Sequence, residues 1–175
     1  SVSLEPTFFY VDDFNRSALG SDWKLSEPFY GSASIDSGAV TVSYGAGEGT
    51  VMLDVPGSSL QDASMTFFLD PALGESGNVN AAVYLRSTGH SHVGILISRG
   101  ETVMINDTNG ISKTQRVFLS PGFYRASVIG NTVTFANVEG GGGTPINLKM
   151  TTYVAGPGSV GFGCNENVIS FDNVT

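Results

Sequence analysis

Short apolar runs with polar residues at every second position recur along the whole chain. In residues 38–44, Val40 and Val42 alternate with Thr41 and Ser43, which is the period of a half-buried β-strand. Helical periodicity is almost absent and allows one turn at most, over residues 58–63. The runs recur every 8 to 12 residues or so, as in a β-sandwich. They predict strands over residues 38–44, 64–70, 80–87, 92–99, 102–107, 115–120, 123–130, 132–138, 159–164 and 167–175.

Glycine-containing segments separate these runs. "RGE" at 99–101 and "GNT" at 130–132 are typical of hairpin turns, in which glycine adopts a positive φ at low cost. Four consecutive glycines at 140–143 predict a loop tip, because strand patterns continue on both sides. No break in composition indicates a domain boundary. We therefore expect an N-terminal arm over residues 1–8 and a single domain over residues 9–175.

Composition and charge narrow the class of protein. The chain has 175 residues, of which 41% are hydrophobic and 14% charged, and its formal net charge is −8. That charge argues against nucleic acid and anionic lipid as partners, since both require a basic face. Cys164 is the only cysteine, so no disulfide forms within the chain, and a buried thiol is expected. No apolar run is long enough to span a membrane.

Four segments together resemble a known superfamily. They are "DDFNRSALGSDW" (12–23), "SIDSGAV" (34–40), "AAVYLRSTGHSHVGILIS" (81–98) and "GSVGFGCNENVISFDNVT" (158–175). In this order they resemble the concanavalin A-like lectin/glucanase superfamily, and most of all its non-catalytic members in bacteriophage minor tail proteins and bacterial surface proteins. The resemblance implies an all-β, antiparallel two-sheet jelly roll whose first and last strands are neighbours. Phe14 and Phe171 would then point into the core.

The alternation of the N-terminal segment agrees with this arrangement. Tyr10, Asp12 and Phe14 lie on one side of an extended chain, while Phe9, Val11 and Asp13 lie on the other side. Trp23 would cover the end of the core, and its indole N–H would need a partner.

The resemblance also implies a calcium site. Many members of the superfamily hold a structural Ca²⁺ where an aspartate of the last strand meets the N-terminal segment. Asp172 matches that position, with Asp12 or Asp13 as its partner, and backbone carbonyls would complete the six to eight oxygen ligands. The alternative is that Asp172 and Asp13 bond neighbouring turns or pair with Arg16.

Lectins of this superfamily bind sugars through aromatic and polar side chains over a concave face. In "AAVYLRS", Tyr84 and Arg86 alternate with Val83 and Leu85, so we expect Tyr84 and Arg86 to share a polar, aromatic face. The alternative is a solvated face or a subunit contact. The candidate glycan ligands are Tyr84, Arg86, His90, His92 and Asn106, with Trp23, Tyr30 and Tyr153 as further candidates.

The carboxylates do not form the motif that glycosidases of the superfamily use. Their catalytic acids lie at alternate positions of one strand, as E-x-D-x-x-E, but the central runs "AAVYLRS" and "GILISR" have no carboxylate. We therefore expect no catalytic activity, and the resemblance to non-catalytic phage members implies a virion structural protein of a bacteriophage, of the minor tail or capsid-decoration type. It would be present in several copies on the virion surface, beside other virion proteins, and would contact host glycans. The alternatives are a secreted bacterial carbohydrate-binding module and, third, a divergent glycosidase.

Overall fold

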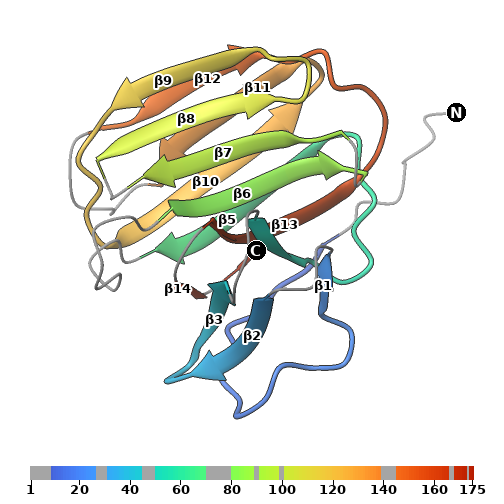
Figure 1. Ribbon diagram of the computed structural model, residues 1–175, viewed down its shortest axis with the longest axis vertical. Coiled ribbons are helices and arrows are strands. Elements are labelled where there is room, and N and C mark those ends of the chain that lie inside the picture. The colour runs from blue at the N-terminus through green and yellow to red at the C-terminus, as the bar shows by residue number, and fades with distance from the viewer. Residues whose placement is uncertain are drawn as a thin grey trace, which may run out of the picture.

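A computed structural model describes residues 9–26, 31–44, 50–69, 80–88, 91–98, 101–138, 145–165, 168–172 and 174–175. These residues form two antiparallel sheets of seven strands each, stacked face to face (Figure 1). This is the two-sheet jelly roll that the sequence predicts. Within the described residues there is no helix long and apolar enough to cross a membrane.

The first sheet, called sheet I, is drawn in front in Figure 1. Its strands, in spatial order, are β1 (Lys24–Ser26), β4 (Thr50–Asp54), β13 (Ser159–Asn165), β6 (Asn80–Ser87), β7 (Val93–Ser98), β8 (Thr102–Asp107) and β9 (Ser112–Arg116). The second sheet, sheet II, has the order β12 (Asn147–Thr151), β11 (Thr132–Asn137), β10 (Gly122–Ile129), β5 (Ala63–Leu69), β14 (Val168–Asp172), β3 (Ala39–Tyr44) and β2 (Gly31–Asp36).

The alternation of apolar residues explains which face of each strand is buried. In β5, Ala63, Met65, Phe67 and Leu69 are buried, and the residues between them are more exposed. Across sheet I, a row of direct cross-strand partners is wholly buried against sheet II: Leu53, Phe162, Val83, Ile95 and Ile105. The core therefore lies between the sheets, and every second residue faces outward.

The first and last segments are neighbours, as predicted. Asp12 and Val174 exchange two backbone hydrogen bonds of 2.9 Å, and Thr175 continues the ladder by pairing with Thr66. Phe14 and Phe171 are fully buried. The rings of Phe162 in β13 and Phe171 in β14, whose centroids are 4.5 Å apart, join the two sheets. Such aromatic pairs contribute about 0.5–1.5 kcal/mol beyond the area that they bury.

Four strands, β1, β2, β4 and β12, were not expected from the pattern, and β9 begins earlier than predicted. The prediction of a strand over 115–120 was wrong because β9, with the sequence SKTQR, has no apolar residue. As an edge strand it is mostly exposed. The "GNT" turn is confirmed: Ile129 pairs with Thr132, and Gly130 has φ 53°. The "RGE" turn lies partly outside the described residues.

A tight backbone contact holds one end of the sandwich closed. Gly158 exchanges hydrogen bonds with Leu60 of 3.1 and 2.9 Å. A Cβ at residue 158 would lie 2.7 Å from the backbone nitrogen of Ser87 and closer still to the carbonyl carbon of Arg86. Since these are backbone atoms, they cannot rotate away.

We expect Gly158→Ala to lower the free energy of unfolding by about 1–3 kcal/mol, because the added methyl group forces the two backbones apart. Gly20→Ala is the matched control, since a Cβ at that glycine would meet nothing within 4 Å. Urea unfolding of both variants measures the difference. Equal stabilities would show that the chains at residue 158 can separate without cost.

Candidate functional site

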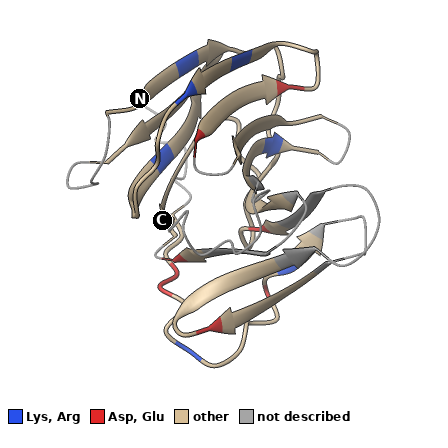
Figure 2. Ribbon diagram, turned by 60° about the vertical axis from the view of Figure 1, so that its left-hand side comes forward, with Lys and Arg blue, Asp and Glu red and all other residues tan. Residues whose placement is uncertain are grey.

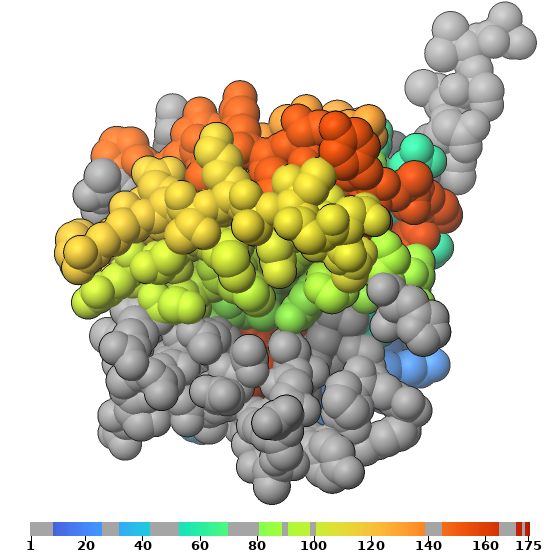
Figure 3. All heavy atoms as spheres, turned by 45° about the horizontal axis from the view of Figure 1, so that its top comes forward, coloured from blue at the N-terminus to red at the C-terminus, as the bar shows by residue number. Residues whose placement is uncertain are grey.

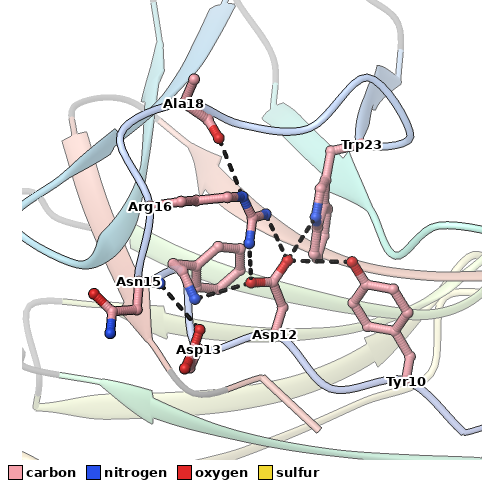
Figure 4. Close-up of polar contacts among 8 residues, drawn as sticks. Tyr10, Asp12, Asp13, Asn15, Arg16, Ala18 and Trp23 are labelled. Atoms are coloured by element: carbon pink, nitrogen blue, oxygen red, sulfur yellow. Dashed lines mark hydrogen bonds and ion pairs between the residues drawn. The ribbon is translucent and has the colours of Figure 1, made fainter.

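The acidic segment near the N-terminus forms a hydrogen-bonded network around Asp12 (Figure 4). Arg16 donates to both carboxylate oxygens of Asp12, at 2.5 and 2.6 Å. The indole N–H of Trp23 and the hydroxyl of Tyr10 donate to Oδ2, at 2.9 and 3.2 Å. The backbone N–H of Phe14 donates to Oδ1 at 2.8 Å. Asp12 is thus a buried acceptor for five hydrogen bonds.

This network fixes a strained turn. Phe14 has φ 51°, a left-handed conformation that costs a residue with a Cβ about 1–2 kcal/mol. Its N–H is bound by Asp12, and its ring packs 5.5 Å from the ring of Trp23. The carboxylate therefore places both aromatic rings in the core.

The same contacts determine the protonation of Asp12 and Tyr10. Burial alone would raise the pKa of Asp12, but the bonds from Arg16, Phe14 and Trp23 outweigh it and hold the pKa below the ordinary value of 3.8. Burial and the Asp12 carboxylate raise the pKa of Tyr10 to about 12. At neutral pH, Asp12 is therefore an acceptor and Tyr10 a donor.

Asp12 does not suit the predicted calcium site. Five protein donors occupy its two oxygens, and the Arg16 guanidinium already stands where a cation would bind. Asp13 is exposed and accepts the N–H of Asn15 at 3.0 Å. Asp172 pairs with Phe68 in sheet II. The described residues contain no group of three metal-ligating side chains. Calcium at Asp13 and Asp172 stays a prediction, and Arg16 pairs with Asp12.

A second set of polar residues lies on the outer face of sheet I. Direct cross-strand pairing aligns five residues across β4, β13, β6, β7 and β8. Because cross-strand partners share a face, and the residues on either side of them in their strands point into the core, this row points away from sheet II. We call it the outer row: Asp54, Gly161, Tyr84, Gly94 and Asn106.

Glycines on both sides of Tyr84 leave it without side-chain neighbours in the two adjacent strands of the outer row. Gly161 and Gly94 are the direct partners of Tyr84 in β13 and β7. Asn106 folds over Gly94, so that a Cβ there would lie 2.5 Å from Asn106 Oδ1. The ring of His92 meets that of Tyr84 edge to face, with centroids 4.9 Å apart. Gly94 thus leaves the space that the Asn106 amide fills.

The outer row contains hydrogen-bonding capacity that the protein does not use. Among the described residues, Asp54 Oδ1 and Asn106 Oδ1 are buried oxygens without a hydrogen-bond partner. Burial raises the pKa of Asp54 and lowers the pKa of His92, so burial favours the neutral form of both groups. An unpartnered buried acceptor costs about 1–3 kcal/mol. Both oxygens are shielded from solvent, so a ligand that donates hydrogen bonds would remove that cost only where the Asp54 and Asn106 side chains turn outward.

The structure therefore brings together three of the predicted glycan ligands: Tyr84, His92 and Asn106. Sequence reasoning missed Asp54 and the two glycines. These three residues can be found from the pairing of strands, which places them in one row with Tyr84, but not from the sequence of any one segment. His90 and Tyr30 lie outside the described residues. Trp23 is buried in the Asp12 network.

The expectation that Arg86 shares the face of Tyr84 was wrong. Where β6 pairs with β13, three steps from Tyr84 to Ser87 oppose two from Gly161 to Ser159, which is a β-bulge. Arg86 has φ 53° in this bulge and is 2% exposed. The extra residue ends the alternation, so Arg86 turns away from the outer row.

Arg86 instead joins three loops at one end of the sandwich. Its guanidinium donates to the carbonyls of Val154 and Gly130 at 2.7 and 2.6 Å, to the carbonyl of Gln61, and to Asp62 Oδ1 at 3.2 Å. These partners leave it no role as an exposed sugar ligand. Tyr153, another candidate, is 67% exposed, and its backbone N–H donates to Asp107, the residue that follows Asn106, at 3.3 Å. Cys164 is buried, as predicted.

No protein-family model matches this sequence, and no curated protein matches it significantly. Solved structures do match its fold. The carbohydrate binding module CBM66 from Bacillus subtilis superimposes with a TM-score of 0.66 at 13% identity, over 88% of this chain and 94% of that one. The Bacillus licheniformis β-glucanase gives 0.66 at 12% identity, over 94% and 95%. A legume lectin-like domain from Entamoeba histolytica gives 0.61 at 8% identity, over 88% of both chains.

The protein has the concanavalin A-like lectin/glucanase fold. Proteins named as a binding module, a glucanase and a lectin-like domain share this jelly roll. At these identities the likeness concerns the fold. The concanavalin A-like fold is thus common to enzymes and non-enzymes, and function must be argued from the residues on it.

We expect Asp12→Asn to lower the free energy of unfolding by about 1–3 kcal/mol, because two charge-assisted bonds from Arg16 are weakened. Asp13→Asn is the control, and its effect should stay within about 0.5 kcal/mol, since Asp13 is exposed. Urea unfolding at pH 7 compares the two variants. Equal effects would mean that the Asp12 network does not support the fold.

The stability of the protein should also fall in acid. The pKa of Asp12 is lower in the folded state than its ordinary value of 3.8. Its contribution is therefore complete above that value and is lost as the pH falls through the lower, folded-state pKa. Asp12→Asn should flatten this acid slope. Some slope should remain, because four hydrogen bonds outweigh burial and lower the pKa of Asp107 as well.

Proposed function

We propose that the outer row binds a saccharide and that the protein is a non-enzymatic, lectin-like structural protein of a bacteriophage virion. The observation that carries the binding proposal is the pair of unpartnered oxygens, Asp54 Oδ1 and Asn106 Oδ1, at the two ends of the row. They are four strand intervals apart, or roughly 19 Å at about 4.8 Å per interval. A saccharide offers hydroxyl donors at such intervals along one molecule.

Tyr84, between these oxygens, is 7% exposed, so a sugar ring reaches the row when the side chains of His92 and Asn106 turn outward. Gly161 and Gly94 leave the floor free of side chains beside Tyr84, and the His92 ring stands next to it. Small-molecule sites are usually concave and combine apolar side chains with a few oriented polar groups. Among proteins of the same fold, one is named a carbohydrate binding module and another a lectin-like domain, which supports this class of ligand.

Binding without hydrolysis is favoured by the number of carboxylates. Glycoside hydrolysis needs two carboxyl groups, about 5–5.5 Å apart in retaining enzymes and about 6.5–9.5 Å apart in inverting enzymes. Asp54 is the one carboxylate among the described outward-facing residues of sheet I. A single acid can orient a sugar, but it cannot act as both acid and nucleophile.

The virion role rests on the resemblance of the segments 12–23 and 158–175 to non-catalytic phage proteins. In this role the protein lies on the virion surface in several copies, beside other virion proteins, and weak single sites gain avidity by repetition. A secreted bacterial carbohydrate-binding module has equal support, since a protein of that name shares the fold. Both roles place the protein outside the bacterial cell.

We expect Asn106→Ala to weaken saccharide binding by about tenfold, the equivalent of one hydrogen bond of roughly 1.4 kcal/mol. The fold should not lose stability, because the substitution removes a buried acceptor that has no partner. Asn147→Ala, at an exposed position of β12 in sheet II, is the matched control and should bind like the wild type. A glycan array selects the ligand, and calorimetry compares the three proteins. Equal affinities for both variants would exclude the outer row, and no ligand on the array would exclude the binding function.

Electron microscopy of the protein in its native assembly tests the virion role. We expect density for this domain to repeat along a phage tail or over a capsid. Free monomers in culture supernatant, with no particle carrying the domain, would contradict the virion role and favour the secreted module.

A further inference from the structure

The two lateral edges of the sandwich differ in charge. At one edge lie β9 of sheet I and β12 of sheet II, which contact each other, and at the other lie β1 and β2. Figure 1 shows them at the top and bottom of the molecule. We call β9 and β12 the upper edge. The lower edge consists of β1, β2 and the turn over residues 12–23 that packs beside them.

The upper edge is basic. Lys113 and Arg116 of β9 and Lys149 of β12 are exposed. Among the described residues of this edge, Glu101 is the exposed acid, and it lies 3.8 Å from Arg116. Figure 3 shows β9 in yellow beside the orange chain of β12. The register places Arg116 on the outer side of sheet I, opposite Thr102, and Lys149 on the outer side of sheet II, opposite Thr134, so the cations lie along both rims of this edge. A basic surface is unexpected on a chain of net charge −8.

The lower edge is acidic. Asp36 ends β2 and is exposed, and Asp22 is exposed in the turn before β1. Asp13 and Asp22 line the same hollow of about 490 Å³. Lys24 is the described cation of this edge that is not held in the Asp12–Arg16 pair. Figure 2 shows lysine and arginine on the upper strands and mainly acidic residues at the lower end.

The upper edge also has features of a contact surface. β9 is the last strand of sheet I, so no strand among the described residues pairs with its outer backbone groups. Two exposed aromatic residues flank the edge: Phe118 after β9, 60% exposed, and Tyr153 after β12, 67% exposed. The Arg116 guanidinium stands 5.8 Å from the Phe118 ring centroid. Lys113 on this edge strand discourages pairing with a neutral strand of another molecule. The surface that complements its charge is an acidic one.

We propose that the lower edge of a second copy of this chain docks on the upper edge. The contact joins two different surfaces, so a pair of copies keeps one free upper edge and one free lower edge, and repetition builds a ring or a filament. At 0.1 M salt the Debye length is about 10 Å. Charges on the far sides of two acidic copies are therefore screened, while the opposite charges at the contact attract. The proposal is independent of what the outer row binds.

Charge reversal of the two edges tests this proposal. One variant is K113E/K149E, which makes the upper edge acidic, and the other is D22K/D36K, which makes the lower edge basic. Sedimentation velocity over a concentration series measures the self-association of each. K149E and R125E form the matched control pair, since both reverse one exposed cation of sheet II but Arg125 lies on β10, away from both edges.

We expect the wild type to self-associate in 0.1 M salt and to dissociate in 1 M salt, where the Debye length is about 3 Å. Each double variant should remain monomeric alone, at least tenfold weaker in association than the wild type. An equimolar mixture of the two variants should associate again. The native acidic lower edge of K113E/K149E then meets the native basic upper edge of D22K/D36K, and the two reversed edges also carry opposite charges. R125E should behave like the wild type and K149E should be weaker.

Three results would overturn the proposal. A wild type that stays monomeric in 0.1 M salt lacks the contact. Association that survives in both double variants uses another surface. A mixture that stays monomeric, although each variant melts like the wild type, shows that charge complementarity does not form the contact.

Discussion

The carboxylate of Asp12 connects the start of the chain to its end. It is held by Arg16, Trp23 and Tyr10 through side-chain bonds, while its backbone pairs with Val174. The terminal segments can pair only if the N-terminal segment is ordered. The turn in that segment consists largely of polar residues, so it buries little apolar area that could stabilise its ordered form. The buried carboxylate supplies that order through directed hydrogen bonds, and the rings of Phe14 and Trp23 enter the core as a result.

The ion pair between Asp12 and Arg16 has a consequence for metal binding at the place where the two terminal segments meet. A metal ion could hold the two terminal segments together, but it would need the oxygens that Arg16 and Trp23 already use. Here the Arg16 guanidinium takes the place of a metal cation. It forks across both oxygens of Asp12 with the geometry of a bidentate pair. The ion pair is internal to one segment, so it forms without an external ligand.

The parts of the fold that depend on alternation could be predicted from sequence. The strand over residues 123–130 was predicted from an apolar period of two and is confirmed as β10, whereas the resemblance to the superfamily placed Phe14 and Phe171 in the core, which the structure also confirms. Arg86 was misplaced because period two assumes a regular strand, and a bulge at positive φ is invisible to it. β9 was misplaced because a wholly polar edge strand has no apolar period. Hydrogen bonding to β8, rather than burial, makes it a strand.

The candidate site shows a further limit of reading one strand at a time. Tyr84, His92 and Asn106 could be found because aromatic and amide side chains are conspicuous in sequence. Asp54 could not, since it meets Tyr84 only through the register of β4 and β13 on either side of Gly161. A site that runs across strands takes one residue from each, so its residues are far apart in the chain and its floor is made of glycines. What defines the outer row is the missing side chains beside Tyr84 and the two oxygens without partners. Both properties belong to the assembled sheet.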